Sequence, residues 1–147
     1  LGLPMAWVPA VILVMSLVYA ASAYPAGLAA RYWSRRTLLA TGLAVLIGAD
    51  LVLANADGIV LVLAGAALWG LHMGLTQGLL AALLADAVPP ARTGTAFGVF
   101  HLAPGVPLLL ASALAGLVWD RYGAPATFLT GAGFSAVALA GLLFYRR

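Results

Sequence analysis

The sequence predicts an all-α fold, a polytopic transmembrane bundle of five helices, on three observations. Apolar residues make up 65% of the 147 residues, whereas charged residues make up only 7%. Mean hydropathy is +1.10, far above the range of water-soluble domains. The apolar residues form continuous blocks, each about as long as a helix that crosses a bilayer. Because so little polar surface is available to face water, we expect the lipid bilayer to surround the chain.

Five blocks reach the roughly 20 residues that a helix needs to cross about 30 Å of hydrocarbon. They belong to a single transmembrane domain, 1–147, and cover residues 5–29, 38–54, 59–85, 95–119 and 125–145. Prolines, charged residues or a short polar turn separate them. Barrel strands are a poor alternative, because barrel segments alternate polar and apolar residues and these blocks do not.

Six of the seven arginines fall on one side of the membrane in this arrangement. They are Arg31, Arg35, Arg36, Arg92, Arg146 and Arg147, whereas Arg121 lies on the other side beside Asp120. Basic loops stay in the cytoplasm, so this side is predicted to be cytoplasmic in a multi-pass protein of the cell membrane. The N-terminus then faces outward and the C-terminus inward. An outward start is natural for a chain whose earlier helices are missing, and we therefore expect a fragment.

Polar side chains inside the spans are candidate functional residues, because they are costly in lipid and usually face the protein interior or a water-filled cavity. His72, Thr76 and Gln77 lie close together near the middle of the third span. His72 and Thr76 share one helix face, and Gln77 lies about 100° further round. His72 is a candidate for coupling a proton to solute movement. A neutral histidine bonded to a neighbouring helix is the structural alternative.

Asp50 stands about twelve residues into the second span, with no basic residue near it in the sequence. It is either a proton or cation site on a water-filled route, or a protonated or hydrogen-bonded group near the outer interface. Tyr19 and His101 are further candidates for a substrate or proton pathway. His101 precedes Pro104 and Pro107, which remove backbone hydrogen bonds and should bend the fourth span. Such a bend is compatible with a helix that moves to gate a pathway, and equally with a helix of fixed bent shape.

Small residues predict where the spans pack closely, because burying leucine against leucine gains nothing over contact with lipid. Gly70, Gly74 and Gly78 recur at every fourth residue of the third span, which makes a ridge that another helix can approach. Gly105 and Gly116 are two further candidate packing positions in the fourth span.

Several classes of function are excluded. The chain has no cysteine, and its two histidines lie on different spans without a carboxylate at metal-ligand spacing. No serine stands in a G-x-S-x-G elbow, and no phosphate-binding glycine loop precedes a helix. The net charge of +3 comes from scattered arginines, so no nucleic-acid partner is expected. We predict no enzyme activity, no cofactor and no metal.

The loop after the first span carries Gly27, Arg35 and Arg36 at a spacing that resembles a cytoplasmic loop of the major facilitator superfamily. That loop reads roughly glycine, three residues, aspartate, arginine, any residue, glycine and two basic residues. Gly27, Arg35 and Arg36 match it. The aspartate, the first arginine and the second glycine are replaced here by Arg31, Tyr32 and Ser34. In the family this aspartate pairs with neighbouring helix ends and steadies one conformation.

A second resemblance begins after the third span. The stretch from Asp86 through Pro89 and Arg92 to Gly94 is similar to the loop between the family's tenth and eleventh helices. Residues 115–123 are similar to the end of the eleventh helix, in the family's order and at its separations. The resemblance implies that the five spans correspond to helices eight to twelve of a twelve-helix transporter, as part of its C-terminal six-helix half. It also implies a missing N-terminal half as the partner.

The resemblance implies secondary active transport of a small solute by alternating access, often coupled to protons. No motif indicates the substrate. The alternative is a membrane scaffold or assembly subunit, which packs against partner helices through its glycines and transports nothing.

Overall fold

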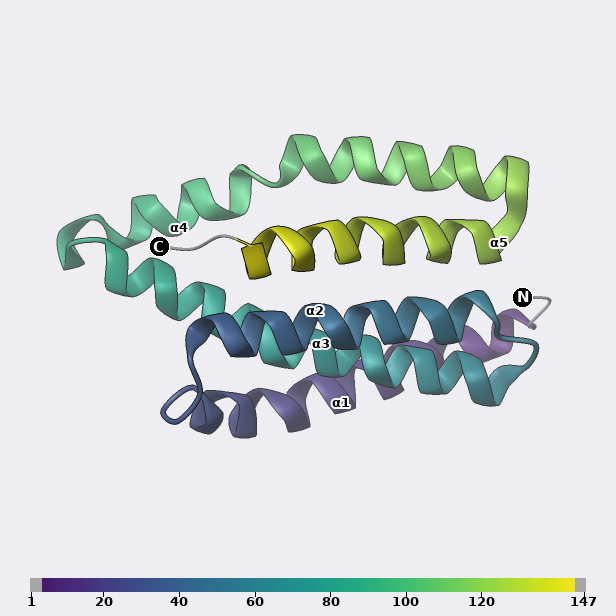
Figure 1. Ribbon diagram of the computed structural model, residues 1–147, viewed down its shortest axis with the longest axis horizontal. Coiled ribbons are helices and arrows are strands. Elements are labelled where there is room, and N and C mark those ends of the chain that lie inside the picture. Colours follow the sequence, from purple (N-terminus) through teal and green to yellow (C-terminus); the bar gives the residue numbers. More distant parts are fainter. Residues whose placement is uncertain (1–3, 145–147) are drawn as a thin grey trace.

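The computed structural model describes residues 4–144, which form helices joined by short turns (Figure 1). The elements in order are η1 (Met5–Trp7), α1 (Val8–Ala29), α2 (Arg35–Ala54), α3 (Ile59–Ala87), η2 (Pro90–Arg92), α4 (Thr93–Leu102) and α5 (Gly105–Phe144). About 90% of the described part is helix and it contains no strand, so the predicted all-α class is confirmed.

The long helix α5 is two helices joined at a sharp bend. Gly123 has φ 81° and ψ 179°, a conformation that a residue with a Cβ rarely adopts. The chain reverses direction there, so α5 has a first arm before Gly123 and a second arm after it (Figure 1). Four helical segments are long and apolar enough to cross a membrane, and the last of them, Pro90–Phe144, contains this reversal. The bundle therefore makes five passes.

Local hydrogen bonds explain where α2 begins and ends. The Ser34 hydroxyl accepts a hydrogen bond from the backbone N–H of Thr37 at 3.0 Å, so Ser34 caps a helix that begins at Arg35, three residues before its apolar block. At the other end, the side-chain amide of Asn55 donates to the carbonyl oxygen of Leu51 at 2.8 Å. These two polar residues satisfy backbone groups that the helix itself leaves free.

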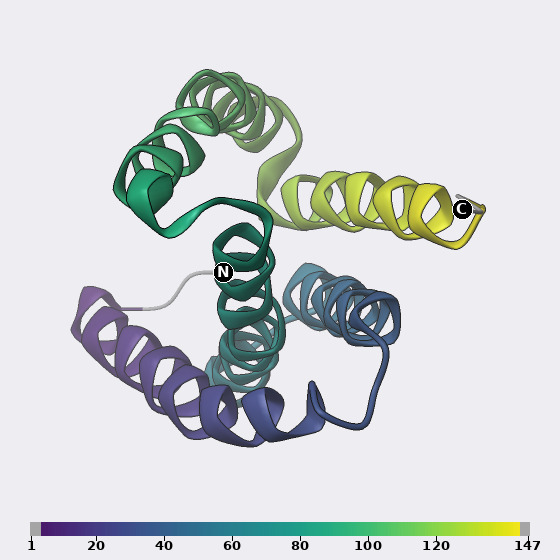
Figure 2. The same ribbon diagram turned by 90° about the vertical axis from the view of Figure 1, so that its left-hand side faces the viewer.

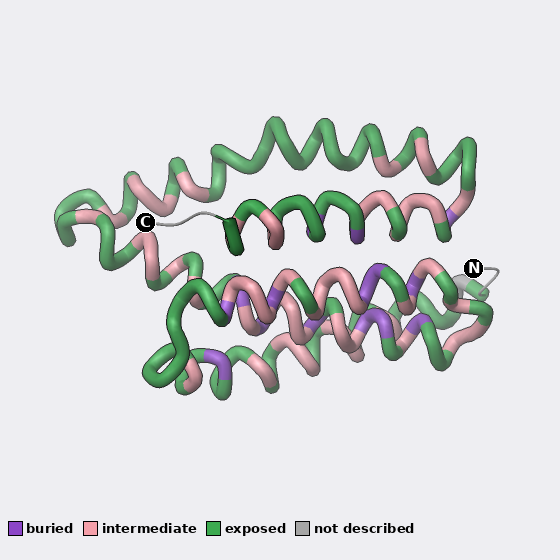
Figure 3. Tube along the Cα trace, in the orientation of Figure 1, coloured by how far each residue is buried: buried purple, intermediate pink, exposed green. Residues whose placement is uncertain are grey.

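Helix α3 is the centre of the packing, with α1 on one side and α2 on the other (Figure 2). Helix α2 also packs against α5. Buried residues lie mainly on α2, α3 and the second arm of α5, whereas α4 and the first arm of α5 are mostly exposed (Figure 3). The best-buried part of the bundle is therefore α2, α3 and the second arm of α5, with α1 packed against α3.

Two glycines of α3 allow α1 to approach backbone to backbone. A Cβ added at Gly70 would overlap the carbonyl oxygen of Met15, and one added at Gly74 would overlap the hydroxyl of Ser22. At Gly78, by contrast, no atom lies within 4 Å of the Cβ position. The closest contact between α1 and α3 is thus limited to the first two glycines of the series.

Replacing Gly70 with alanine is expected to push α1 away from α3, because the obstructing atom is backbone and cannot rotate aside. We expect Gly70→Ala to lower the free energy of unfolding by about 1–3 kcal/mol. Gly78→Ala is the matched control, about two turns further along the same helix. It should leave the free energy of unfolding unchanged or raise it slightly. Denaturant unfolding of the full-length protein in detergent measures both. Equal effects of the two variants would contradict the proposed contact.

Candidate functional site

A cavity of about 520 Å³ opens between α1, α3 and α4. Three of the polar residues singled out from the sequence line it, each from a different helix: Tyr19 from α1, Gln77 from α3 and His101 from α4. The rest of the lining consists of Gly78, Leu80, Ala81, Phe97 and Phe100. The cavity thus offers a hydroxyl, an amide and an imidazole to a solute, within walls that are otherwise apolar.

The imidazole of His101 lies in an aromatic cluster on α4. Its ring centroid is 5.3 Å from that of Phe100 and 6.3 Å from that of Phe97. Helix α4 ends one residue later, at Leu102, and α5 begins at Gly105. Pro104 lies in this break because it has no amide hydrogen to donate to the preceding turn. His101 is therefore held by aromatic neighbours at the end of a short helix.

His72 and Thr76 lie on a different face of α3, toward α2. The Nδ1 atom of His72 is 2.8 Å from the carbonyl oxygen of Gly42. Because a carbonyl oxygen only accepts, Nδ1 carries the hydrogen and donates it. The hydroxyl of Thr76 donates to the carbonyl oxygen of His72 at 2.9 Å. His72 therefore ties α3 to α2, and neither residue lines the cavity that contains Gln77.

Asp50 lies in a third place, between α2 and the second arm of α5. It is only 4% exposed. A Cβ at Gly131 would lie 3.0 Å from its Oδ2 atom, so the glycine leaves room for the carboxyl group. The six polar candidates thus divide into three groups: the three residues of the cavity, the His72–Thr76 pair on the side of α3 that faces α2, and Asp50 alone.

The residues of the loop motifs lie near the ends of the helices. Arg35 at the start of α2 forms an ion pair with Asp86 at the end of α3, with Nη2 and Oδ2 2.5 Å apart. Both side chains are more than half exposed, so the pair adds little stability and mainly fixes where two helix ends meet. Arg36 donates a hydrogen bond to the carbonyl oxygen of Leu143 near the end of α5. The remaining motif residues are all exposed: Gly27, Arg31, Arg92 and Gly94.

Two glycines that the sequence reasoning did not single out make room for polar side chains. Gly42 accommodates Thr76, whose methyl group a Cβ at this position would overlap, and Gly131 accommodates Asp50. A glycine inside an apolar span indicates close packing, but it does not indicate the partner helix. Gly105 and Gly116 have no atom within 4 Å of their Cβ positions.

A bundle of five apolar passes, with three polar side chains in a cavity between its helices, defines a polytopic integral membrane protein. A family model described as the Major Facilitator Superfamily matches residues 2–147, and the chain belongs to that superfamily. The superfamily consists of membrane transport proteins, which are typically not enzymes. Neither the search of curated proteins nor the search of solved structures gave a match.

The contact between Gly42 and Thr76 gives a test of the α2–α3 packing. Gly42→Ala should lower the free energy of unfolding by about 1–3 kcal/mol, because the new Cβ meets the Thr76 methyl group. Adding Thr76→Ser removes that methyl group and keeps the hydroxyl that bonds to His72, so the double variant should regain most of the loss. Gly48→Ala, on the same helix with nothing within 4 Å, is the control. Unfolding curves that show no rescue would argue against this packing.

Proposed function

We propose that this chain forms part of a secondary active transporter that moves a small solute across the membrane by alternating access. The cavity of Tyr19, Gln77 and His101 carries the proposal, because hydrogen-bonding groups from three helices meet there within otherwise apolar walls. Such groups are costly within a membrane and mark solute or ion pathways. Membership of a transport superfamily supports the same function.

Alternating access needs a second half, which we propose to be the N-terminal half of the same protein. Two halves rock against each other about a central site in transporters of this kind. Every residue from 105 to 114 is exposed, so the beginning of α5 offers surface to further protein (Figure 3). The cavity of Tyr19, Gln77 and His101 would then be this chain's share of a site between the halves.

The end of the bundle that carries Arg31, Arg35, Arg36 and Arg92 is proposed to face the cytoplasm. The ion pair between Arg35 and Asp86 supports placing the α1–α2 loop and the α3–α4 loop on the same side of the membrane. Positively charged loops are retained on the cytoplasmic side during insertion, and that rule is the basis of the assignment. The N-terminus of the chain is then outside and the C-terminus inside.

We propose that proton coupling of transport runs through His101. Its imidazole lies at the cavity, and histidine side chains serve as proton shuttles in proteins. Tyr19 is the other titratable residue of the cavity lining. His72 donates to the carbonyl of Gly42 and Asp50 packs against Gly131, so we propose structural roles for those two residues.

The transport proposal predicts that the cavity residues set the affinity for the solute. Uptake of a panel of radiolabelled small solutes by the full-length protein in proteoliposomes identifies a substrate. With that substrate, Tyr19→Phe, Gln77→Leu and His101→Asn should each raise KM about three- to tenfold, through the loss of one hydrogen bond. Ser135→Ala, a buried polar residue outside the cavity, is the control and should change KM little. Failure to take up any solute would favour the scaffold function instead.

The coupling proposal predicts a selective loss in His101→Asn. An inward proton gradient should no longer accelerate uptake by this variant, whereas exchange of solute at equal pH on both sides continues. Asp50→Asn and His72→Gln should keep most of the response to the gradient, since their side chains lie outside the cavity. Uptake by each variant, measured with and without a pH gradient, shows which residue the coupling needs. A full response in His101→Asn would rule out the assignment, and loss in Asp50→Asn or His72→Gln would move the coupling role to that residue.

A further inference from the structure

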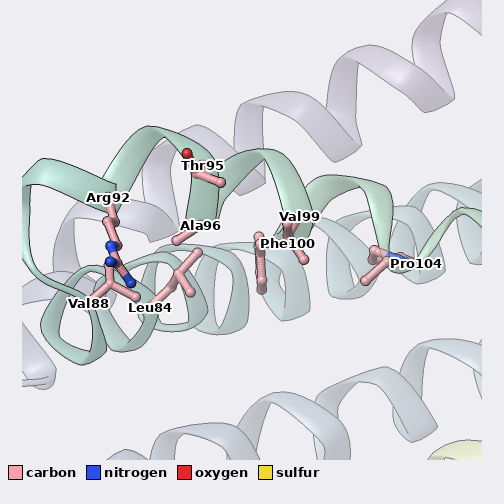
Figure 4. Close-up of a pocket in the computed structure, with 9 residues that line it drawn as sticks. Leu84, Val88, Arg92, Thr95, Ala96, Val99, Phe100 and Pro104 are labelled. Carbon is pink, nitrogen blue, oxygen red and sulfur yellow. The ribbon is translucent and has the colours of Figure 1, made fainter.

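A second cavity lies between the end of α3 and α4, and its lining differs from that of the cavity of Tyr19, Gln77 and His101, which we call the solute cavity. It is an open groove of about 780 Å³. Its walls are apolar, with Leu84 from α3, Val88 from the turn that follows, and Val99 and Phe100 from α4 (Figure 4). Unlike the solute cavity, it contains no amide, imidazole or phenol among its lining residues. The groove is therefore suited to an aliphatic ligand.

One end of the groove carries a positive charge. Arg92 lines it, and its side chain extends toward Leu84 and Val88 (Figure 4). The side chain is exposed, and the ion pair found among residues 4–144 joins Arg35 to Asp86 and leaves Arg92 out. A guanidinium in this position complements a phosphate group, with which it forms strong, charge-assisted hydrogen bonds.

The dimensions and depth of the groove fit one leaflet of a bilayer. Arg92 follows directly after the turn that contains Pro89 and Pro90, where the chain leaves one pass and enters the next. From Arg92 to Pro104 the chain is mostly helical and advances roughly 18 Å at about 1.5 Å per residue. Half of a hydrocarbon core of about 30 Å is about 15 Å. The groove therefore runs from the level of the headgroups to about the middle of the membrane.

We propose that this groove binds an anionic phospholipid, with the phosphate at Arg92 and one acyl chain along Leu84, Val99 and Phe100. The charged end and the apolar length match the two parts of such a lipid, in the orientation that a bilayer imposes. Direct contact between α3 and α4 is limited, so the lipid fills space that the protein leaves open. It would thereby connect the packed helix α3 to the segment that carries His101.

The test uses the full-length protein, reconstituted with a photoactivatable phosphatidylglycerol that carries a diazirine on its acyl chain. A phosphatidylcholine with the same acyl chain is the matched zwitterionic lipid. Crosslinks mapped by peptide mass spectrometry are expected within residues 84–104, about fivefold more with phosphatidylglycerol. Arg92→Gln should reduce this yield to the phosphatidylcholine level, whereas Arg31→Gln, an exposed arginine outside the groove lining, should leave it unchanged.

A second variant tests the groove itself. Val99→Trp fills the apolar channel and should remove the crosslinks, in protein whose gel-filtration profile and helix content match the parent. If this variant does not fold, the comparison of Arg92→Gln with Arg31→Gln decides alone. Three results would overturn the proposal: no crosslinks within residues 84–104, as expected if a helix of the same protein covers the groove; equal yields with both lipids; or equal losses in the two arginine variants.

Discussion

The arrangement of the bundle depends on the close approach of α1 to α3 at Gly70 and Gly74. Lipid gives helices no hydrophobic reason to associate, so contact must come from close packing of small residues. The same contact positions the site, because a Cβ at Gly70 would also lie 3.2 Å from the backbone nitrogen of Tyr19. The backbone of Tyr19 is thereby held beside Gly70, about two turns of α3 before Gln77. A structural contact between backbones thus sets the distance between two of the polar groups that line the cavity.

Helix α3 uses different faces for packing and for lining the cavity. Gly70 and Gly74 meet α1, His72 and Thr76 meet α2, and Gln77 faces the cavity. Successive residues of a helix point about 100° apart, so neighbours such as Thr76 and Gln77 can serve different partners. The cluster of polar residues in this short stretch is therefore two sites and not one. This division assigns His72 to the joint between α2 and α3, where its Nδ1 hydrogen is already used.

Composition and turn residues were enough to predict the helical class and the number of passes, because a span must be long, apolar and bounded by polar residues. The reversal in α5 also falls at a break in the apolar sequence, where Gly123, with positive φ, follows Asp120 and Arg121. Which faces meet was not predictable. A helix that is apolar all round has no amphipathic pattern to show its buried side, so nothing in the sequence relates Asp50 to Gly131 or Thr76 to Gly42. Tyr19, Gln77 and His101 could be named as polar residues in apolar spans, but only packing groups them apart from the other candidates.

The two walls of the cavity lined by Tyr19, Gln77 and His101 differ in how firmly they are held, and this difference bears on the proposed mechanism. Tyr19 and Gln77 belong to α1 and α3, whose backbones touch. His101 belongs to α4, which is exposed along much of its length and is followed by a break at Pro104. A ligand shifts a conformational equilibrium only as far as it binds one state better than the other. In the proposed transport cycle, a solute that bonds to both Gln77 and His101 satisfies this condition, because it favours the state in which α4 lies against the α1–α3 pair. Movement of α4 about its ends is then the change within this chain that solute binding can drive.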